Sequence, residues 1–413
     1  MKGKQLFILL VLAAVAGGAW YFLGKQNRST WSETGGGGGK VVEFPINDVA
    51  RLKIKSSAGE LNLVKKNDAW TVQERSDYPA NFEQVSGLLR KLWELKTVQE
   101  VKVGASQLPR LELDEPGKGD KAGTLVEVIS ADGKTLAALL LGKPHVRKTE
   151  GGADLGGFGG FPTGRYVKVI GSAKVSLVSD PLTEAAIKPE AWLLKDFVKV
   201  DGPKAIAVTG ATDAQKWSVT RYNATAEWKL ADAKPDEKVD GSKASPLGNL
   251  LSAPTFADVL APDAQPEDSG LDKPTVATIE TFDGFRYELK IGKASAENYP
   301  VLIAVSASLP KERPPGKDEK PEDKQKLDEE FQAKRKKQEE KLAAEQKFTG
   351  RAYLVSKSAL EPLLKDRTGL LPDKPTEPAP ATSATTPPIP VPPASSATTP
   401  PVQAPPAPAP ENR

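Results

Sequence analysis

The chain has 413 residues, no cysteine and one histidine, and its 57 Lys and Arg residues nearly balance 54 Asp and Glu residues. The absence of cysteine excludes a disulfide framework and a thiol-linked lipid anchor. The charges are interspersed and form no concentrated basic region, which argues against nucleic-acid binding. A zinc site would have to consist mainly of carboxylates, which is uncommon. We therefore expect no metal and no cofactor.

Residues 1–28 predict a membrane anchor. Lys2 and Lys4 precede uncharged, mainly apolar residues from Leu6 to Leu23, a length that as a helix crosses roughly 27 Å of hydrocarbon. Aromatic residues 20–22 follow at the far end, where amphipathic rings favour the headgroup layer. The charge bias slightly favours a cytoplasmic N-terminus, so we expect a single-pass protein of the bacterial inner membrane with a periplasmic body. The alternative is a cleaved signal peptide with its small-residue site at residues 17–19.

Low-complexity segments flank the central part of the chain. Residues 29–40 contain the unbroken run Gly35–Gly39, which predicts a flexible tether. Residues 372–413 are rich in proline and repeat the hexapeptide Ser-Ala-Thr-Thr-Pro-Pro, which predicts a disordered, partly polyproline II tail. Spacing through an envelope layer, display of a proline-rich ligand, and a tail without a partner are the three alternatives.

Residues 41–198 predict a first α+β module. Alternating apolar residues on both sides of Ala58-Gly59 predict a strand pair, and residues 70–72 predict a third short strand. Asn81 is a good N-cap for a helix with one apolar face. That face is predicted to contain Phe82, Val85, Leu88, Leu89, Leu92 and Leu95. Asp132-Gly133 predicts a tight hairpin turn between strands at residues 125–129 and 135–141.

The signals of the first module recur in the same order farther along the chain, which predicts a duplicated module. Each copy has a Leu-Asp-x-Pro turn, an Asp-Gly hairpin and a Gly-Lys pair after the hairpin, and a valine lies twelve residues before the leucine. The first copy has Leu113–Pro116, Asp132–Gly133 and Gly142–Lys143, and the second has Leu271–Pro274, Asp283–Gly284 and Gly292–Lys293. The alternative is two unrelated α+β domains that share common turn sequences.

We therefore expect an α+β chain with two tandem related modules of mainly antiparallel strands, each with one or two helices. The second module is assigned to residues 199–371, and Asp283-Gly284 joins its predicted strands at residues 276–282 and 286–291. Pro246 and Gly248 predict that its helix is shorter or broken.

Two insertions break the predicted symmetry. Gly151 to Gly164 contains seven glycines and two phenylalanines but no Gly-Lys-Ser/Thr, so it is no phosphate loop. A long hairpin tip is the favoured interpretation, and presentation of the aromatics to a membrane or partner is the alternative. Residues 311–347 are rich in Lys and Glu and predict a solvated helix with pairs such as Glu330–Lys334 and Lys336–Glu340. The alternative is a projecting helix that pairs with another protein through a thin apolar stripe.

The sequence shows no catalytic arrangement. His145 lies among basic residues and is expected in an exposed loop. Ser308 to Lys311 matches Ser-x-x-Lys, but Pro310 argues against the helical turn that this pattern uses. A pair of carboxylates acting on a glycan stays open as an alternative. We predict no catalytic, cofactor-binding or metal-ligating residue, and no enzyme.

The order of these signals resembles the bacterial domain-of-unknown-function family numbered 4340. The resemblance rests on the hairpin with Trp70, the helix ending at Leu92–Leu95, the repeated turns and the strand Ser176–Val178, and it covers roughly residues 41–371. It implies a membrane anchor, a module that is often doubled, and genes beside gliding-motility-type ABC transporter permease and auxiliary proteins. Its motifs are structural and imply no functional residue.

Together, these observations predict a membrane-anchored, extracytoplasmic binding or scaffold protein, accessory to an ABC-type export or envelope-assembly system. We expect a protein partner in the envelope, and neither a nucleic acid nor a small-molecule ligand. The alternatives are a carboxylate-dependent envelope hydrolase and a cell-wall-binding spacer.

Overall fold

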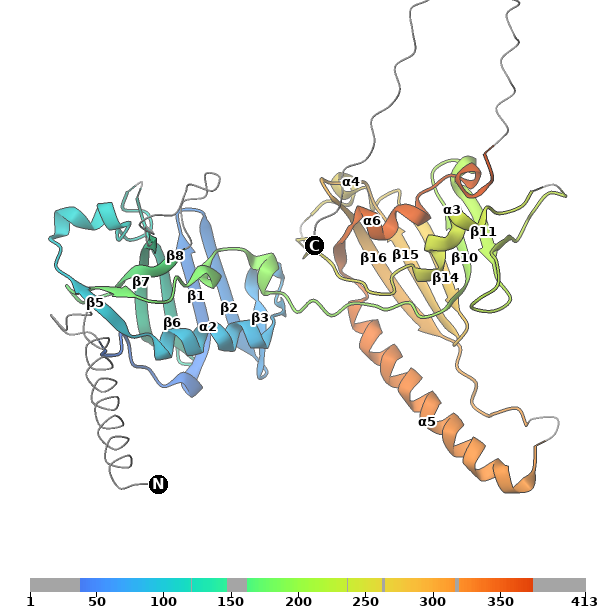
Figure 1. The fold of residues 1–413 in the computed structure, drawn as a ribbon, viewed down its shortest axis with the longest axis horizontal. Helices are drawn as coiled ribbons and strands as arrows, with labels where there is room; N and C mark the ends of the chain where they lie inside the picture. Colours follow the sequence, from blue (N-terminus) through green and yellow to red (C-terminus); the bar gives the residue numbers. More distant parts are fainter. Residues whose placement is uncertain are drawn as a thin grey trace, which may run out of the picture. The chain divides into compact units, whose positions relative to one another are not determined.

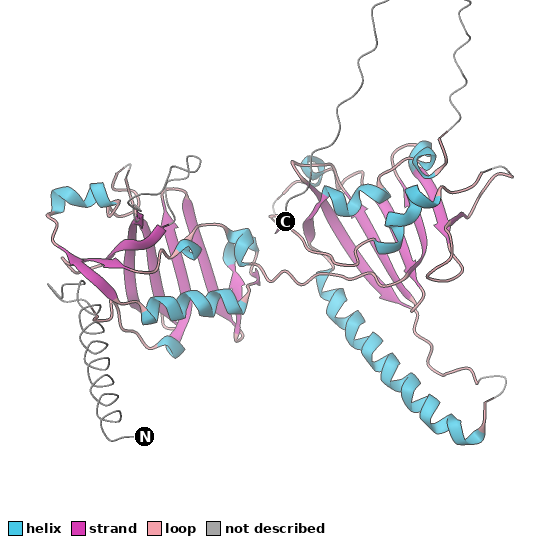
Figure 2. Ribbon diagram, viewed as in Figure 1, coloured by secondary structure: helices cyan, strands magenta, loops and turns pink. Residues whose placement is uncertain are grey.

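The structure, a computed structural model, describes residues 38–119, 121–146, 162–235, 237–261, 264–315 and 319–373. Within these residues the chain is α+β, with two mainly antiparallel sheets and few helices (Figures 1 and 2). The predicted anchor at residues 1–28 lies outside the described residues, as do most of the tether and the tail. None of the helices in the described ranges is long and apolar enough to span a membrane.

The first sheet has nine strands in the order β4-β3-β2-β1-β6-β7-β8-β9-β5. The strands are β1 (Val49–Ser56), β2 (Gly59–Lys66), β3 (Ala69–Val72), β4 (Tyr78–Pro79), β5 (Thr97–Val101), β6 (Thr124–Ser130), β7 (Thr135–Val146), β8 (Pro162–Val169) and β9 (Val175–Val178). Leu52 faces Leu63 across the β1–β2 pair, and Ile54 faces Leu61. All four side chains are fully buried, so the alternation in the sequence places one face of this hairpin in the core.

Helix α2 (Phe82–Glu94) lies across one face of the first sheet (Figure 1). The Asn81 side chain accepts hydrogen bonds from the backbone N–H groups of Glu83 at 3.0 Å and Gln84 at 3.3 Å, which confirms the predicted N-cap. The predicted apolar face is buried from Val85 onward. Phe82 is an exception: it lies in the first helical turn and is 65% exposed. The apolar face is therefore one turn shorter than predicted.

The second sheet has eight strands in the order β12-β11-β10-β14-β15-β16-β17-β13. They are β10 (Pro203–Thr209), β11 (Lys216–Thr220), β12 (Lys229–Leu230), β13 (Asp258–Val259), β14 (Thr275–Thr281), β15 (Phe285–Ile291), β16 (Asn298–Ala307) and β17 (Ala352–Ser356). The described helices here are α3 (Gly241–Ala244), α4 (Pro266–Ser269), α5 (Pro321–Glu345) and α6 (Lys357–Leu360). A 3-10 turn with Pro246 and Gly248 follows α3 directly, so the helix in this part of the chain is short and broken, as predicted.

The strand order of the second sheet equals that of the first sheet without β4, if β10 is matched with β1. The repeated turns occupy matching places. Asp132-Gly133 joins β6 to β7 and Asp283-Gly284 joins β14 to β15, and the two glycines have φ of +86° and +88°. Positive φ is the reason that this turn needs glycine.

The repeated Leu-Asp-x-Pro turn and Gly-Lys pair lie against each other in both halves of the fold. A Cβ atom on Gly142 would lie 2.3 Å from the Leu111 carbonyl oxygen and 2.8 Å from Leu113 Cδ2. One on Gly292 would lie 2.2 Å from the Ser269 carbonyl oxygen and 3.3 Å from Leu271 Cδ2. The turn therefore comes so close to the strand that no larger residue fits.

The largest difference between the sheets is the connection that follows β8 in the first and β16 in the second. Residues 170–174 join β8 to β9, whereas residues 308–351, which include α5, join the matching strands β16 and β17. Figure 1 shows α5 extending away from the second sheet. The charged insertion predicted at residues 311–347 is therefore helical from Pro321 to Glu345.

Candidate functional site

Helix α5 contacts the rest of the chain through a narrow row of residues on one of its sides. The less exposed residues of α5 fall along one side of the helix and are Asp328, Phe331, Arg335, Gln338, Lys341, Leu342 and Glu345. Glu345 is the only buried residue within α5. Most of this row is polar, so hydrogen bonds and ion pairs, more than apolar burial, hold the helix in place.

The outer part of the row binds the segment that leads into the helix. Arg313 Nε donates a 3.0 Å hydrogen bond to Asp328 Oδ1, and Arg335 donates a 3.1 Å bond to the Lys311 carbonyl oxygen. Nearer the sheet, Gln338 Nε2 donates a 2.9 Å bond to the carbonyl oxygen of Asp283 in the β14–β15 turn. The helix is thus fixed at successive turns along one side.

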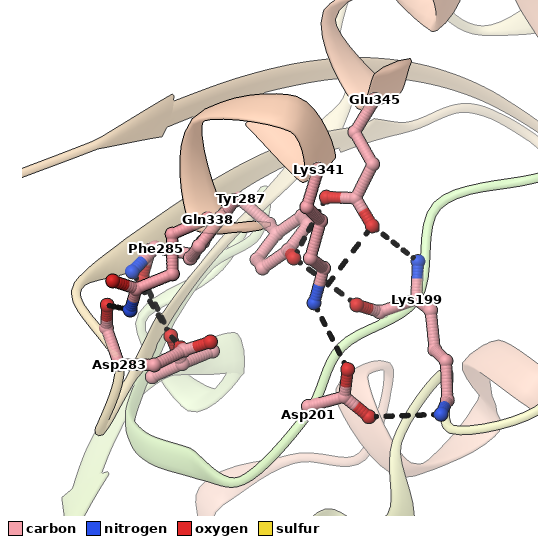
Figure 3. A network of polar contacts seen from close by, with 9 residues as sticks. Lys199, Asp201, Asp283, Phe285, Tyr287, Gln338, Lys341 and Glu345 are labelled. Atoms are coloured by element: carbon pink, nitrogen blue, oxygen red, sulfur yellow. Dashed lines mark hydrogen bonds and ion pairs between the residues drawn. The ribbon is translucent and has the colours of Figure 1, made fainter. Parts of the chain in front are cut away.

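The row ends in a polar network at the base of α5, formed by Lys199, Asp201, Tyr287, Lys341 and Glu345 (Figure 3), of which Tyr287 and Glu345 are buried. Glu345 is 5% exposed. Its Oε1 accepts a 2.9 Å hydrogen bond from the Lys199 backbone N–H, and its Oε2 lies 2.9 Å from the Tyr287 hydroxyl. These contacts join the last residue of α5, strand β15 and the chain entering the second sheet.

Burial raises the pKa of the Glu345 carboxyl, because a buried carboxylate loses its hydration. The Lys199 N–H, the Tyr287 hydroxyl and Lys341 act in the opposite direction but do not outweigh it. The Tyr287 hydroxyl also lies 3.1 Å from the Lys199 carbonyl oxygen, although a phenol has only one proton to donate. A protonated Glu345 can donate to Tyr287 and leave that proton for Lys199, so the neutral acid satisfies every group.

On the exposed side of the network, Lys341 and Lys199 both pair with Asp201. Lys341 Nζ lies 2.9 Å from one oxygen of Asp201, and Lys199 Nζ lies 3.1 Å from the other. Partial burial disfavours the charged form of Asp201, but its hydrogen bonds with Lys341 and Lys199 outweigh that effect, and its pKa is lowered. Lys341 Nζ also lies 4.9 Å from the Phe285 ring centre. The base of α5 therefore combines a carboxylate held between two cations with a separate buried acid.

The network contains one buried acid, Glu345, and both of its oxygens bind groups of the protein. The buried polar residues of the described ranges are Thr71, Thr281 and Glu345. Only the last of these is acidic. A glycosidase needs two carboxyl groups on either side of the bond that it cleaves. The described residues also contain no cluster of three or more acidic or His side chains that could hold a metal ion.

Two hollows in the described part of the chain also lack paired buried acids. One, of about 450 Å³, lies beside α2, and Glu184 in its wall forms an ion pair with Lys91. The other, of about 460 Å³, lies beside α4 and is lined by residues such as Leu271, Leu302 and Arg351, with no acidic residue.

A second cluster of contacts joins residues of the first sheet to residues of the second. Arg75, after β3, forms two 2.6 Å hydrogen bonds with the carboxylate of Asp258 in β13, and this pairing raises the pKa of Arg75. The Tyr78 ring packs edge-on against Phe256 at 5.7 Å and Tyr353 at 6.2 Å between ring centres. Two-point ion pairing and aromatic packing are contacts with a defined geometry, so they favour one arrangement of these residues.

A family model described as Domain of unknown function (DUF4340) matches residues 70–274. The chain belongs to the DUF4340 family. The match runs from β3 in the first sheet to the residue before β14 in the second. No curated protein and no solved structure matches the chain. Membership of the DUF4340 family therefore confirms the resemblance seen in the sequence and assigns no residue a role.

The structure of this DUF4340 member corrects two expectations, one about His145 and one about the ion pairs of α5. His145 lies in β7, opposite Gly164, and not in an exposed loop. It is half-buried, with its ring 6.0 Å from that of Tyr166, because β7 continues past Leu141 to pair with β8. The ion pairs along α5 also differ from those predicted: Lys326 pairs with Glu330 at 3.9 Å and Arg335 with Glu339 at 2.9 Å.

Two other predicted features have simpler outcomes. Residues 308–311, which match Ser-x-x-Lys, lie outside any helix, in agreement with the argument from Pro310. Most of the Gly-rich loop, residues 151–161, lies outside the described residues, and Pro162 to Gly164 begin β8.

Sequence reasoning missed the network at the base of α5. Lys199, Tyr287 and Glu345 are far apart in the chain and carry no shared motif. One signal was present, because Glu345 continues the spacing of Phe331, Arg335, Gln338 and Leu342 along one side of the helix. An acidic residue at the end of such a row indicates a polar contact with the sheet.

Proposed function

We propose that this DUF4340 protein is a single-pass, membrane-anchored extracytoplasmic scaffold, accessory to an ABC-type export or envelope-assembly system, and that α5 is its binding arm. The observation that carries this proposal is a long, charged helix attached to its sheet by a polar row that ends at the buried Glu345, and exposed elsewhere. The anchor that the sequence predicts at residues 1–28 and the gene neighbourhood that the family resemblance implies support the location and the type of partner.

We also propose that the two sheets are related copies of one module, with boundaries near residues 41–198 and 199–371. The equal strand order, the Asp-Gly turns and the contacts of Gly142 and Gly292 support this relation. A duplicated module explains why the first sheet needs only residues 170–174 where the second has α5. The arm is then an addition to a module that is complete without it, and such an addition points to a role in binding.

The scaffold proposal is favoured over a carboxylate hydrolase by the interior of the described residues. Glu345 is the least exposed acidic residue there, and its oxygens are occupied by Lys199 and Tyr287. A cell-wall-binding spacer makes a separate prediction, namely that the purified protein sediments with isolated cell wall. Failure to sediment leaves protein binding as the function.

The location is tested by fractionation and protease accessibility. The full-length chain should remain in the membrane fraction, and protease added to spheroplasts should degrade its body while a cytoplasmic control protein stays intact. Recovery of the full-length chain in the cytosol would contradict the proposal.

The binding role is tested with a trimmed-arm variant, in which a short Gly-Ser linker replaces residues 312–336. Such a linker can close the gap because the Arg335 guanidinium donates a 3.1 Å hydrogen bond to the Lys311 carbonyl oxygen, so the two backbones lie within the length of one arginine side chain. After cross-linking in intact cells, the wild-type protein should carry with it permease or envelope components that the trimmed-arm variant and an anchor-only control lack. Equal recovery with all three proteins would exclude α5 as the binding arm.

A further inference from the structure

The outward face of α5 has a charge pattern that inverts about its centre. This face lies opposite the row that contacts the rest of the chain. Counted from Ala333, Lys326 lies seven residues before, and Glu329 and Glu330 lie four and three residues before. On the other side, Lys336 and Lys337 lie three and four residues after, and Glu340 lies seven residues after. All seven residues are exposed.

We propose that this outward face pairs with the same face of a second copy of the chain, in antiparallel orientation, with the two-fold axis at Ala333. Residues at equal distances on either side of the axis then face each other. The opposed pairs are Lys337 with Glu329, Lys336 with Glu330, and Glu340 with Lys326 of the second copy, each formed twice. Every pair joins opposite charges, and the small Ala333 side chain lets the helices come close where they cross.

Within the described part of a single chain, some of the charged side chains on this face have no partner of opposite charge. Lys326 pairs with Glu330 at 3.9 Å, and Gln325 donates a hydrogen bond to Glu329 at 2.9 Å. Lys336, Lys337 and Glu340 form no ion pair with any described residue. The four consecutive cations at residues 334–337 repel one another, and an acidic stretch from a second helix relieves that repulsion.

Charge complementarity sets the expected strength of this pairing. Ion pairs between exposed side chains are individually weak, and screening limits them to about 8 Å at physiological ionic strength. We therefore expect a weak dimer that dissociates as salt is added. The inference deepens the proposed function, since it rests on α5 as a binding surface and names a second copy as its partner.

Cysteine cross-linking tests the orientation, because the chain has no cysteine of its own. In the full-length protein, Ala333→Cys should form a disulfide-linked dimer under mild oxidation. Ala344→Cys is the matched control, exposed on nearly the same face but eleven residues from the axis. Its two copies would lie about 33 Å apart in an antiparallel pair and should not cross-link. Equal cross-linking of both variants would indicate parallel or random contact and overturn the proposal, as would no cross-linking of Ala333→Cys.

Charge reversal tests the pairing itself in the Ala333→Cys background. The double variant Lys336→Glu with Lys337→Glu should lose the cross-link, and so should Glu329→Lys with Glu330→Lys. A mixture of the two double variants, or all four substitutions in one chain, should restore it. If the double variants cross-link as well as their parent, the opposed charges do not hold the helices together. Continued capture of envelope partners without any cross-link would leave the proposed scaffold role intact and remove only the dimer.

Discussion

The two sheets share a strand order but differ where β8 meets β9 and β16 meets β17. The first sheet makes this connection with residues 170–174, and the second makes it with the segment that contains α5. Because a short turn suffices in one sheet, the arm of the other is not needed to close the fold. Under the proposed duplication, this difference separates the strands that build the module from the helix that has been added to it.

The core changes where the arm is attached. Tyr287 lies five residues before Gly292, and the residue five before Gly142 is Ala137. Both are buried in the matching strands β15 and β7, but only the tyrosine has a hydroxyl group to meet Glu345. The sheet that carries α5 therefore has a tyrosine at the position that contacts the base of the helix. The sheet without such a helix has an alanine at the corresponding position.

The largest effects are expected at the two glycines that the sheets share. Gly142→Ala and Gly292→Ala should each lower the free energy of unfolding by about 3 kcal/mol, because the new Cβ atom meets a backbone oxygen that cannot move aside. Gly87→Ala in α2 is the control, since a Cβ there meets nothing within 4 Å and should stabilise the helix by about 0.5–1 kcal/mol. Chemical denaturation measures all three. Similar values for the three variants would show that the shared glycines are not required.

Substitution of Glu345 tests a contact that occurs only at the sheet that carries α5. Glu345→Ala should cost about 2 kcal/mol, because it leaves the Lys199 N–H without its acceptor. Glu345→Gln retains an acceptor and a donor and should stay within about 1 kcal/mol of wild type at neutral pH. A loss with glutamine as large as that with alanine would show that the charged carboxylate is essential.

A comparison of wild type with Glu345→Gln across a range of pH tests the raised pKa of Glu345. A folded-state pKa above the ordinary value of 4.5 means that the folded protein binds the proton more tightly. The contribution of Glu345 is then fully present below pH 4.5 and declines as the pH rises through the folded pKa. Glu345→Gln lacks this titration, so its stability relative to wild type should increase with pH above 4.5. A difference that stays constant or falls with pH would contradict the raised pKa.

The Arg75–Asp258 pair should have a smaller effect. A double-mutant cycle with alanine at both positions should give a coupling energy of about 1–2 kcal/mol, because both side chains are about four-fifths buried and bonded at two points. The control is the exposed pair Lys65–Asp68, 3.2 Å apart, whose coupling should be below about 0.5 kcal/mol. Equal couplings would indicate that the Arg75 contact is loose in solution.

The smallest effect compares the helices at matching places in the two sheets. Asn81→Ala should cost about 1 kcal/mol because Asn81 caps the long helix α2. Asp240→Ala removes the same kind of cap from the four-residue helix α3, and we expect a smaller loss there. Thermal unfolding of both variants checks the order. A larger loss at Asp240 would reverse the ranking of these helices.

Much of the fold could be predicted from local sequence signals. Asp-Gly turns, alternation in β1 and β2, and the Asn81 cap each depend on a few adjacent residues, and the structure confirms them. The base of α5 depends on Lys199, Tyr287 and Glu345, which only the folded sheet brings together. His145 was misplaced for the same reason, because the length of β7 is set by its partner β8.

Hydrogen exchange of the trimmed-arm variant tests most directly whether α5 is an addition to a complete module. The variant retains Gln338 to Glu345 and with them the contacts to Lys199, Asp283 and Tyr287. We predict that the backbone amides of β14 to β17 keep the protection that they have in the full-length protein. Loss of protection across these strands would show that the second sheet needs its arm to fold, and would contradict the account.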